Sequence, residues 1–232
     1  YNYPDTTMNR FSHEIPDRAF MKALLKHTGI ALALLVPLAA YSTFSHAETG
    51  IPTTNTNEDS MNITAPTSID SVDLNKYAGQ WYEIARLPMY FQRNCASDVT
   101  ATYNLNTDKA GKLNSVEVIN QCRKQDGSMM KSEGLAKPAN DTGSELKVTF
   151  LPSWLRWLPV GKADYWVLQL DKDYQSALVG TPDNKYLWVL SRKPTLSEAV
   201  FEDYKKTAKM QGYDINKLEV TTHTGTPKTI VE

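Results

Sequence analysis

Eight short segments between residues 80 and 191 constrain the fold of this 232-residue chain more than any other feature. Each segment is enriched in β-branched and aromatic residues, and clusters of Gly, Asn, Asp or Pro separate it from the next. The segments are 80–87, 97–105, 112–121, 129–137, 145–151, 163–170, 176–180 and 186–191. Short strands in such close succession are typical of a sandwich or an up-and-down barrel. We therefore expect an all-β domain of eight antiparallel strands.

One helix is expected after the last strand. Thr195 and Glu198 have the spacing of a capping box, which makes Thr195 the predicted N-cap. An apolar stripe at helical spacing follows, and Gly212 is placed to end the helix. The stripe consists of Val200, Tyr204, Ala208 and Met210. The expected architecture is thus eight strands and one C-terminal α-helix.

The first 47 residues have the features of an export signal. Residues 21–47 combine a positively charged start, an apolar run over 30–40 and small residues at Ser45 and Ala47, where a signal peptidase cleaves. The apolar run is about half as long as the roughly 20 residues that span a membrane, although an uncleaved anchor is the alternative. We expect residues 1–20 to be upstream sequence and residues 21–47 to be a signal peptide.

The rest of the chain divides by composition. Residues 48–70 are rich in Thr, Asn, Ser and Pro with few large apolar side chains, which predicts a flexible linker. The folded domain is expected over residues 71–222, and residues 223–232 form a C-terminal tail.

Two cysteines, Cys95 and Cys122, lie within the expected domain. An even pair in an exported protein favours a disulfide, with two free buried thiols as the alternative. A hairpin centred on residues 107–111 sets Cys95 opposite Cys122. The same register places one apolar set on a single face: Val99, Ala101, Tyr103, Val116 and Val118.

Charge and histidine content exclude several functions. The formal net charge is -1 and no basic block is present, so we expect no nucleic-acid partner. No histidine lies between Glu48 and Thr222, which removes the commonest general base and metal ligand from the domain. We therefore expect no metal site and no cofactor.

Three motifs resemble the signatures of the lipocalins, in particular bacterial lipocalins and apolipoprotein D. The first is Gly-Gln-Trp-Tyr-Glu-Ile-Ala-Arg at residues 79–86, the second is Asp164-Tyr165, and the third is Leu-Trp-Val-Leu-Ser-Arg at residues 187–192. The resemblance covers about residues 72–220. It implies an up-and-down β-barrel in which Trp81 closes the narrow end and Arg192 lies across its indole in a structural role.

The resemblance also implies that the side chain of Trp188 contacts a ligand. Alternation along the strands gives further candidates for the lumen, each of which is alternatively a packing residue. The ligand-binding candidates are Trp188, Tyr103, Leu190, Val99, Ala101, Val116 and Val118.

Two loops at the expected open end carry an unusual number of large apolar residues. They are Met89, Tyr90, Phe91, Trp154, Leu155, Trp157 and Leu158. Such residues need an apolar partner, and Trp together with Arg156 is typical of contact with a membrane interface. A lid over the barrel mouth or a homodimer contact is the alternative.

The predicted function is binding, and carriage or storage, of a lipid or similar small apolar ligand, such as a fatty acid or lysophospholipid, in the bacterial cell envelope. The alternative is a lipocalin-like enzyme acting on an isoprenoid or lipid, with the inward-facing Glu83 as general base. The residue directly after Ala47 is Glu48, not the cysteine on which a lipid anchor would be built. We expect a periplasmic or secreted protein, with unanchored outer-membrane association as a further alternative.

Overall fold

The structure, a computed structural model, describes residues 63–232 and forms a closed antiparallel β-barrel. Each strand pairs with the next, and β1 also pairs with β8, which closes the sheet. The strands are β1 (Gly79–Arg86), β2 (Cys95–Thr107), β3 (Leu113–Lys124), β4 (Met129–Pro138), β5 (Glu145–Thr149), β6 (Lys162–Leu170), β7 (Ser176–Gly180) and β8 (Leu187–Ser191). The expected all-β fold is confirmed. The expectations for residues 1–62 lie outside the described residues.

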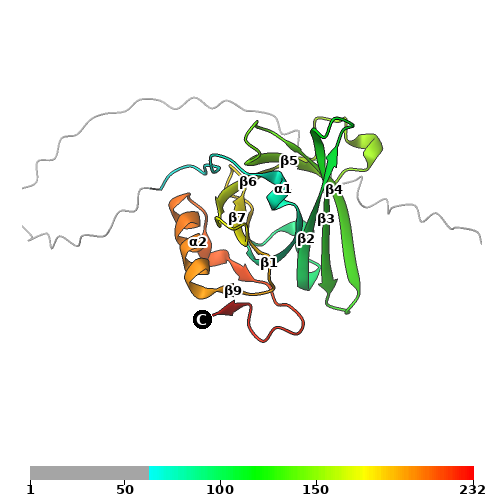
Figure 1. Ribbon diagram of the computed structural model, residues 1–232. Helices are drawn as coiled ribbons and strands as arrows, with labels where there is room; N and C mark the ends of the chain where they lie inside the picture. Colours follow the sequence, from blue (N-terminus) through cyan, green and yellow to red (C-terminus); the bar gives the residue numbers. More distant parts are fainter. Residues whose placement is uncertain (1–62) are drawn as a thin grey trace, which may run out of the picture. The chain divides into compact units, whose positions relative to one another are not determined.

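Helices and short strands flank the barrel (Figure 1). They are α1 (Leu74–Tyr77), η2 (Tyr90–Gln92), η3 (Ser153–Leu155), β9 (Leu196–Ser197), α2 (Glu198–Met210), η4 (Ile215–Lys217), β10 (Glu219–Val220) and β11 (Ile230–Val231). Within the described residues, no helix has the length and hydropathy needed to cross a bilayer.

Strand alternation divides the apolar side chains between two cores. One core fills the closed part of the barrel, and the other lies between the outside of the barrel and α2. In β7, Ala177 and Val179 belong to the inner core and Leu178 to the outer one. All five residues of β7 are consequently buried. Because both faces of β7 are buried, its sequence contains no charged residue, whereas apolar and polar residues alternate in strands that have one solvated face.

Helix α2 begins two residues later than expected. Ser197, not Thr195, is the N-cap, and its side chain accepts a hydrogen bond from the Val200 amide. The prediction for Thr195 was wrong because β9 pairs in parallel with β11 and holds the chain extended through Ser197. The predicted helix end is confirmed, since Gly212 has φ +83°.

The disulfide Cys95–Cys122 is confirmed, with 5.5 Å between the Cα atoms. The predicted register was wrong, however, because Cys95 pairs with Lys124 in the ladder and Tyr103 pairs with Val118. Asp108 accepts hydrogen bonds from backbone amides within the turn, which places the turn further along the chain than expected. Between Thr100 and Asn106 the slip is an even number of residues, so the side chains of this regular part of the ladder keep their predicted faces.

Both predicted boundaries of the domain need correction. Within the expected linker, the amide of Ile69 donates to the Val167 carbonyl at 2.9 Å, and Ile69 packs against the inner core. Residues 64–70 therefore belong to the domain. At the other end, His223 is buried and its Nε2 lies 2.8 Å from the Glu83 carbonyl oxygen. The expected tail is also part of the fold, since β11 pairs with β9.

Candidate ligand-binding site

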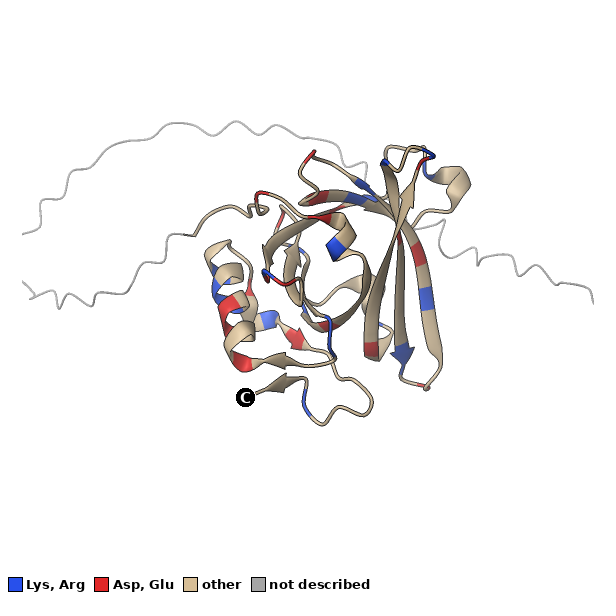
Figure 2. Cartoon of the chain, in the orientation of Figure 1, with Lys and Arg blue, Asp and Glu red and all other residues tan. Residues whose placement is uncertain are grey.

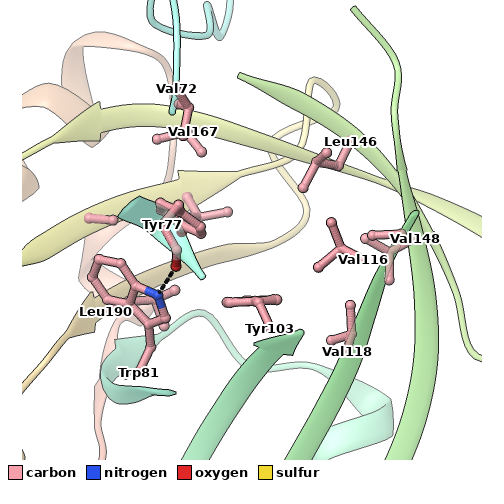
Figure 3. Packing of buried hydrophobic residues seen from close by; sticks show 13 residues of the cluster. Val72, Tyr77, Trp81, Tyr103, Val116, Val118, Leu146, Val148, Val167 and Leu190 are labelled. Atoms are coloured by element: carbon pink, nitrogen blue, oxygen red, sulfur yellow. Dashed lines mark hydrogen bonds between the residues drawn. The ribbon is translucent and has the colours of Figure 1, made fainter. Parts of the chain in front are cut away.

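The narrow end of the barrel is sealed by Trp81, which is 0% exposed (Figure 3). Its Nε1 donates to the Tyr77 carbonyl at 2.8 Å. The Arg192 guanidinium lies 3.8 Å from the indole centroid, in the stacked geometry of a cation–π pair. It also donates to four backbone carbonyls, those of Lys76, Tyr77, Gln80 and Tyr174. Trp81 and Arg192 thus have the predicted structural geometry.

Three tyrosines lie above this seal. The Tyr165 hydroxyl is 2.7 Å from that of Tyr77 and 3.0 Å from that of Tyr103. Burial raises the pKa of Tyr103 to about 12 and raises the pKa of Tyr77 and Tyr165 well above the usual value. We call these three residues the tyrosine floor, because they form the inner limit of the open part of the lumen.

An inner cavity of about 100 Å³ lies over the tyrosine floor. Its wall includes six of the seven side chains predicted to face the lumen: Trp188, Tyr103, Leu190, Val99, Ala101 and Val118. Val116 is not part of this wall, because it pairs with Leu105 closer to the sealed end and is packed into the inner core. Alternation along the strands therefore predicted which side chains face the lumen, and the depth of the cavity in the barrel decided which of them line it.

The inner cavity opens into an outer vestibule of about 720 Å³. Both spaces are lined by Phe91 and Gln92 from η2 on one side and by Phe150 on the other. The charged side chains of the inner wall, Glu83 and Asp164, are acidic, whereas the vestibule carries both signs, with Lys162 and Lys185 alongside Asp164 and Asp183. The interior is thus apolar and aromatic with acidic groups, and basic groups lie toward the mouth.

A bulge in β1 brings Arg86 to the same inward side as Glu83. Glu83 pairs with Leu190 and Arg86 with Trp188, and the register shifts between them. Residues that pair across strands share a face, so both charged side chains turn toward the side of Trp188. They form a salt bridge of 2.8 Å.

Gln92 connects this salt bridge to the candidate ligand contact. Its Nε2 donates to Glu83 at 2.9 Å, and its Oε1 accepts from the Trp188 indole at 3.2 Å. Glu83 also accepts a hydrogen bond from Thr221 at 2.6 Å. With donors from Arg86, Gln92 and Thr221, the Glu83 carboxylate is arranged as a structural acceptor. This geometry does not favour the role of general base.

The aromatic loops lie at the mouth. Trp154 and Trp157 are 72% and 77% exposed, and Tyr90 and Phe91 are also exposed. Leu155 and Leu158 are half-buried. Met89 is only 7% exposed and therefore does not contribute to an exposed surface, contrary to its prediction. Met89 lies at the N-cap of η2.

Sequence reasoning missed several residues of the site. Asn120 has the parity of Val118, and Tyr186 has the parity of Trp188, so alternation was a sufficient signal for both. Tyr165 was noted as part of a motif but not as a lumen residue. Gln92 carried no local signal, because only the folding of η2 over the barrel brings its amide to Glu83.

Metal and nucleic-acid sites find no support in residues 63–232. In this part of the chain, no group of three or more His, Cys, Asp or Glu side chains is placed to hold a metal ion. Charges of both signs are interspersed along α2 and the β3–β4 hairpin (Figure 2). Such a mixed surface differs from the basic face of a nucleic-acid-binding protein.

A closed eight-stranded barrel, sealed at one end and containing an apolar lumen with an aromatic mouth, defines a class of small-ligand-binding barrels. A family profile described as "Lipocalin-like domain" matches residues 72–223. The protein belongs to the lipocalin family.

Relatives lie in plants, bacteria and animals. Temperature-induced lipocalin-1 of Arabidopsis thaliana is 39% identical over 68% of this chain and 83% of that protein. Outer membrane lipoprotein Blc of Escherichia coli K12 is 39% identical over 66% and 80%, and apolipoprotein D of Bos taurus is 29% identical over 69% and 82%. The structure of insecticyanin from the tobacco hornworm covers 73% of this chain and 90% of its own at 22% identity, with a TM-score of 0.53. This last similarity shows the fold.

Proposed function

We propose that this protein binds a lipid with an acyl chain, such as a fatty acid or lysophospholipid, and carries or stores it in the bacterial cell envelope without catalysing a reaction. The observation behind the proposal is the lumen, in which an aromatic and aliphatic inner cavity continues into a wider vestibule. Burial of an acyl chain there supplies roughly 0.8 kcal/mol for each methylene removed from water.

The polarity of the lumen supports a particular orientation. No basic side chain lines the inner wall, whose charged residues Glu83 and Asp164 are already paired with other cations, whereas Lys162 and Lys185 line the vestibule together with Asp164 and Asp183. We therefore infer that the chain enters first and an anionic headgroup stays at the mouth. The disulfide fits an exported protein, and the relationship to the Blc lipoproteins supports a place in the envelope.

Titration with palmitate or lysophosphatidylethanolamine tests this function. We expect saturable quenching or shift of tryptophan fluorescence, because Trp188 lines the cavity. Ala101→Phe fills the inner cavity and is expected to weaken binding about tenfold or more. Thr102→Phe, at the neighbouring position on the opposite face, is the matched control. Lack of saturable binding by the wild-type protein contradicts the proposal.

We also propose that the mouth contacts a membrane surface. Loops 88–94 and 150–161 contain no Asp or Glu but include Arg93 and Arg156. Arg93 stacks 3.7 Å from the centroid of Tyr90, an arrangement of cation and aromatic ring suited to lipid headgroups. Exposed Trp154 and Trp157 extend the same surface next to the entrance of the vestibule.

Co-sedimentation with phosphatidylglycerol and phosphatidylethanolamine vesicles tests the membrane contact. The double variant Trp154→Ser, Trp157→Ser is expected to lose most of the bound fraction, whereas Val220→Ser, which changes an exposed apolar residue on β10, retains it. Equal sedimentation of all three proteins contradicts membrane docking. A change of mass in solution caused by the double variant alone indicates a homodimer contact instead.

A further inference from the structure

The three hydroxyls of the tyrosine floor carry more protons than there are hydrogen bonds to receive them. Tyr77, Tyr103 and Tyr165 each carry one hydroxyl proton. The described residues give the three hydroxyls two hydrogen bonds, both of which involve Tyr165. Two bonds use two protons, so one of the three protons remains without an acceptor.

This surplus does not depend on the direction of the bonds. If Tyr165 donates to Tyr103, the Tyr103 proton is left over, and if it donates to Tyr77, the Tyr77 proton is left over. If Tyr165 accepts from both neighbours, its own proton is left over. Two of the three arrangements therefore place the free donor on Tyr103 or Tyr165, the members of the tyrosine floor that line the inner cavity.

A buried hydroxyl without an acceptor is costly, at about 1–3 kcal/mol. Tyr103 is only 6% exposed, so solvent does not compensate it from outside the barrel. Burial also raises the pKa of all three phenols, so they stay protonated and able to donate well above neutral pH. An acceptor supplied by a ligand would satisfy this donor.

We propose that the tyrosine floor selects ligands whose inward end carries a neutral hydrogen-bond acceptor, a carbonyl or hydroxyl oxygen. This inference rests on the proposed binding function. A neutral acceptor fits better than a carboxylate, because no basic side chain lines the inner cavity to pair with a buried carboxylate, and the acidic Glu83 and Asp164 are already paired with Arg86 and Lys147. The oxygen of such a ligand accepts the surplus hydroxyl proton of Tyr103 or Tyr165.

A pair of ligands tests the inference: palmitate, and its keto analogue with a carbonyl on the carbon next to the terminal methyl. The measured quantity is the ratio of the two dissociation constants, obtained by calorimetry. We expect the double variant Tyr103→Phe, Tyr165→Phe to lower the relative preference for the keto analogue about three- to tenfold, the equivalent of one hydrogen bond. Tyr186→Phe, which removes a hydroxyl elsewhere in the same cavity wall, should leave the ratio unchanged.

The single variant Tyr165→Phe provides a second test if the double variant does not fold. It removes both hydrogen bonds and leaves the Tyr103 hydroxyl free toward the cavity, so the preference for the keto analogue is retained or increased. If palmitate binds and the ratio of the two dissociation constants is the same in the wild type and the double variant, the tyrosine-floor inference alone is overturned. Failure of the wild type to bind either compound overturns the binding function as well.

Discussion

Arg192 acts through the shape of its side chain as well as through its charge. The planar guanidinium stacks on Trp81 and at the same time donates to backbone carbonyls at the sealed end of the barrel. A lysine carries the same charge but lacks the flat face and the fork of donors. The residue at this position therefore decides whether the seal of the barrel is complete.

We expect Arg192→Lys to lower the free energy of unfolding by about 1–3 kcal/mol, because the backbone carbonyls lose donors and Trp81 loses its stacked guanidinium. Guanidinium denaturation followed by tryptophan fluorescence measures the change. Lys193→Gln, at the exposed neighbouring position, should have an effect within about 0.5 kcal/mol. Equal stability of Arg192→Lys and the wild type would show that the stack contributes little.

Helix α2 illustrates how an element depends on its surroundings. Its capping motif is ambiguous in the sequence, because Thr195 and Ser197 both have suitable side chains. Pairing of β9 with β11 keeps the chain extended through Ser197 and so selects this residue as the N-cap. At the other end, the Tyr213 amide bonds to Ala208 and the Gly212 amide to Lys209, which completes a Schellman motif.

Replacement of Ser197 by alanine is expected to lower stability by about 1 kcal/mol, because the Val200 amide loses its acceptor. Thr195→Ala, at the other candidate cap, should cost less, since its side chain does not cap the helix. Thermal unfolding monitored by circular dichroism compares the two variants. A larger loss for Thr195→Ala would contradict the assignment of the cap.

The whole molecule buries tyrosines in both of its cores. Tyr103 belongs to the inner core and Tyr204 to the outer core, where its hydroxyl lies 2.8 Å from that of Ser176. Burial raises the pKa of each phenol from 10.0 to about 12. Both cores therefore favour the protonated form of their tyrosines.

Stability should consequently fall at alkaline pH. Between about pH 10 and pH 12 the unfolded chain loses phenolic protons that the folded protein retains, so the unfolded state gains stability as the pH rises. Below pH 10 this contribution is fully present. Urea denaturation at a series of pH values measures the decline, and Tyr204→Phe should make it shallower by removing one titrating group. A free energy of unfolding that stays constant up to pH 12 would rule out this contribution.

Local patterns were sufficient to predict the strands, the disulfide and part of the cavity wall. Alternation along a strand is a property of neighbouring residues, so Val99, Ala101 and Val118 could be assigned to the lumen face before the pairing was known. An even slip of the β2–β3 register left this assignment intact. Met89 and Val116 were misplaced because burial and depth depend on how a loop or strand is set within the barrel.

The sequence by itself determined the eight-stranded class and the faces of the strands, because these follow from periodicity, and its resemblance to the lipocalin signatures implied the sealed end at Trp81. Only the tertiary structure decided that Gln92 reaches Glu83 and that the C-terminal segment packs against the barrel. It also brought together the three hydroxyls of the tyrosine floor, from α1, β2 and β6. These contacts join residues far apart in the chain, and their geometry depends on register, a β-bulge and barrel closure.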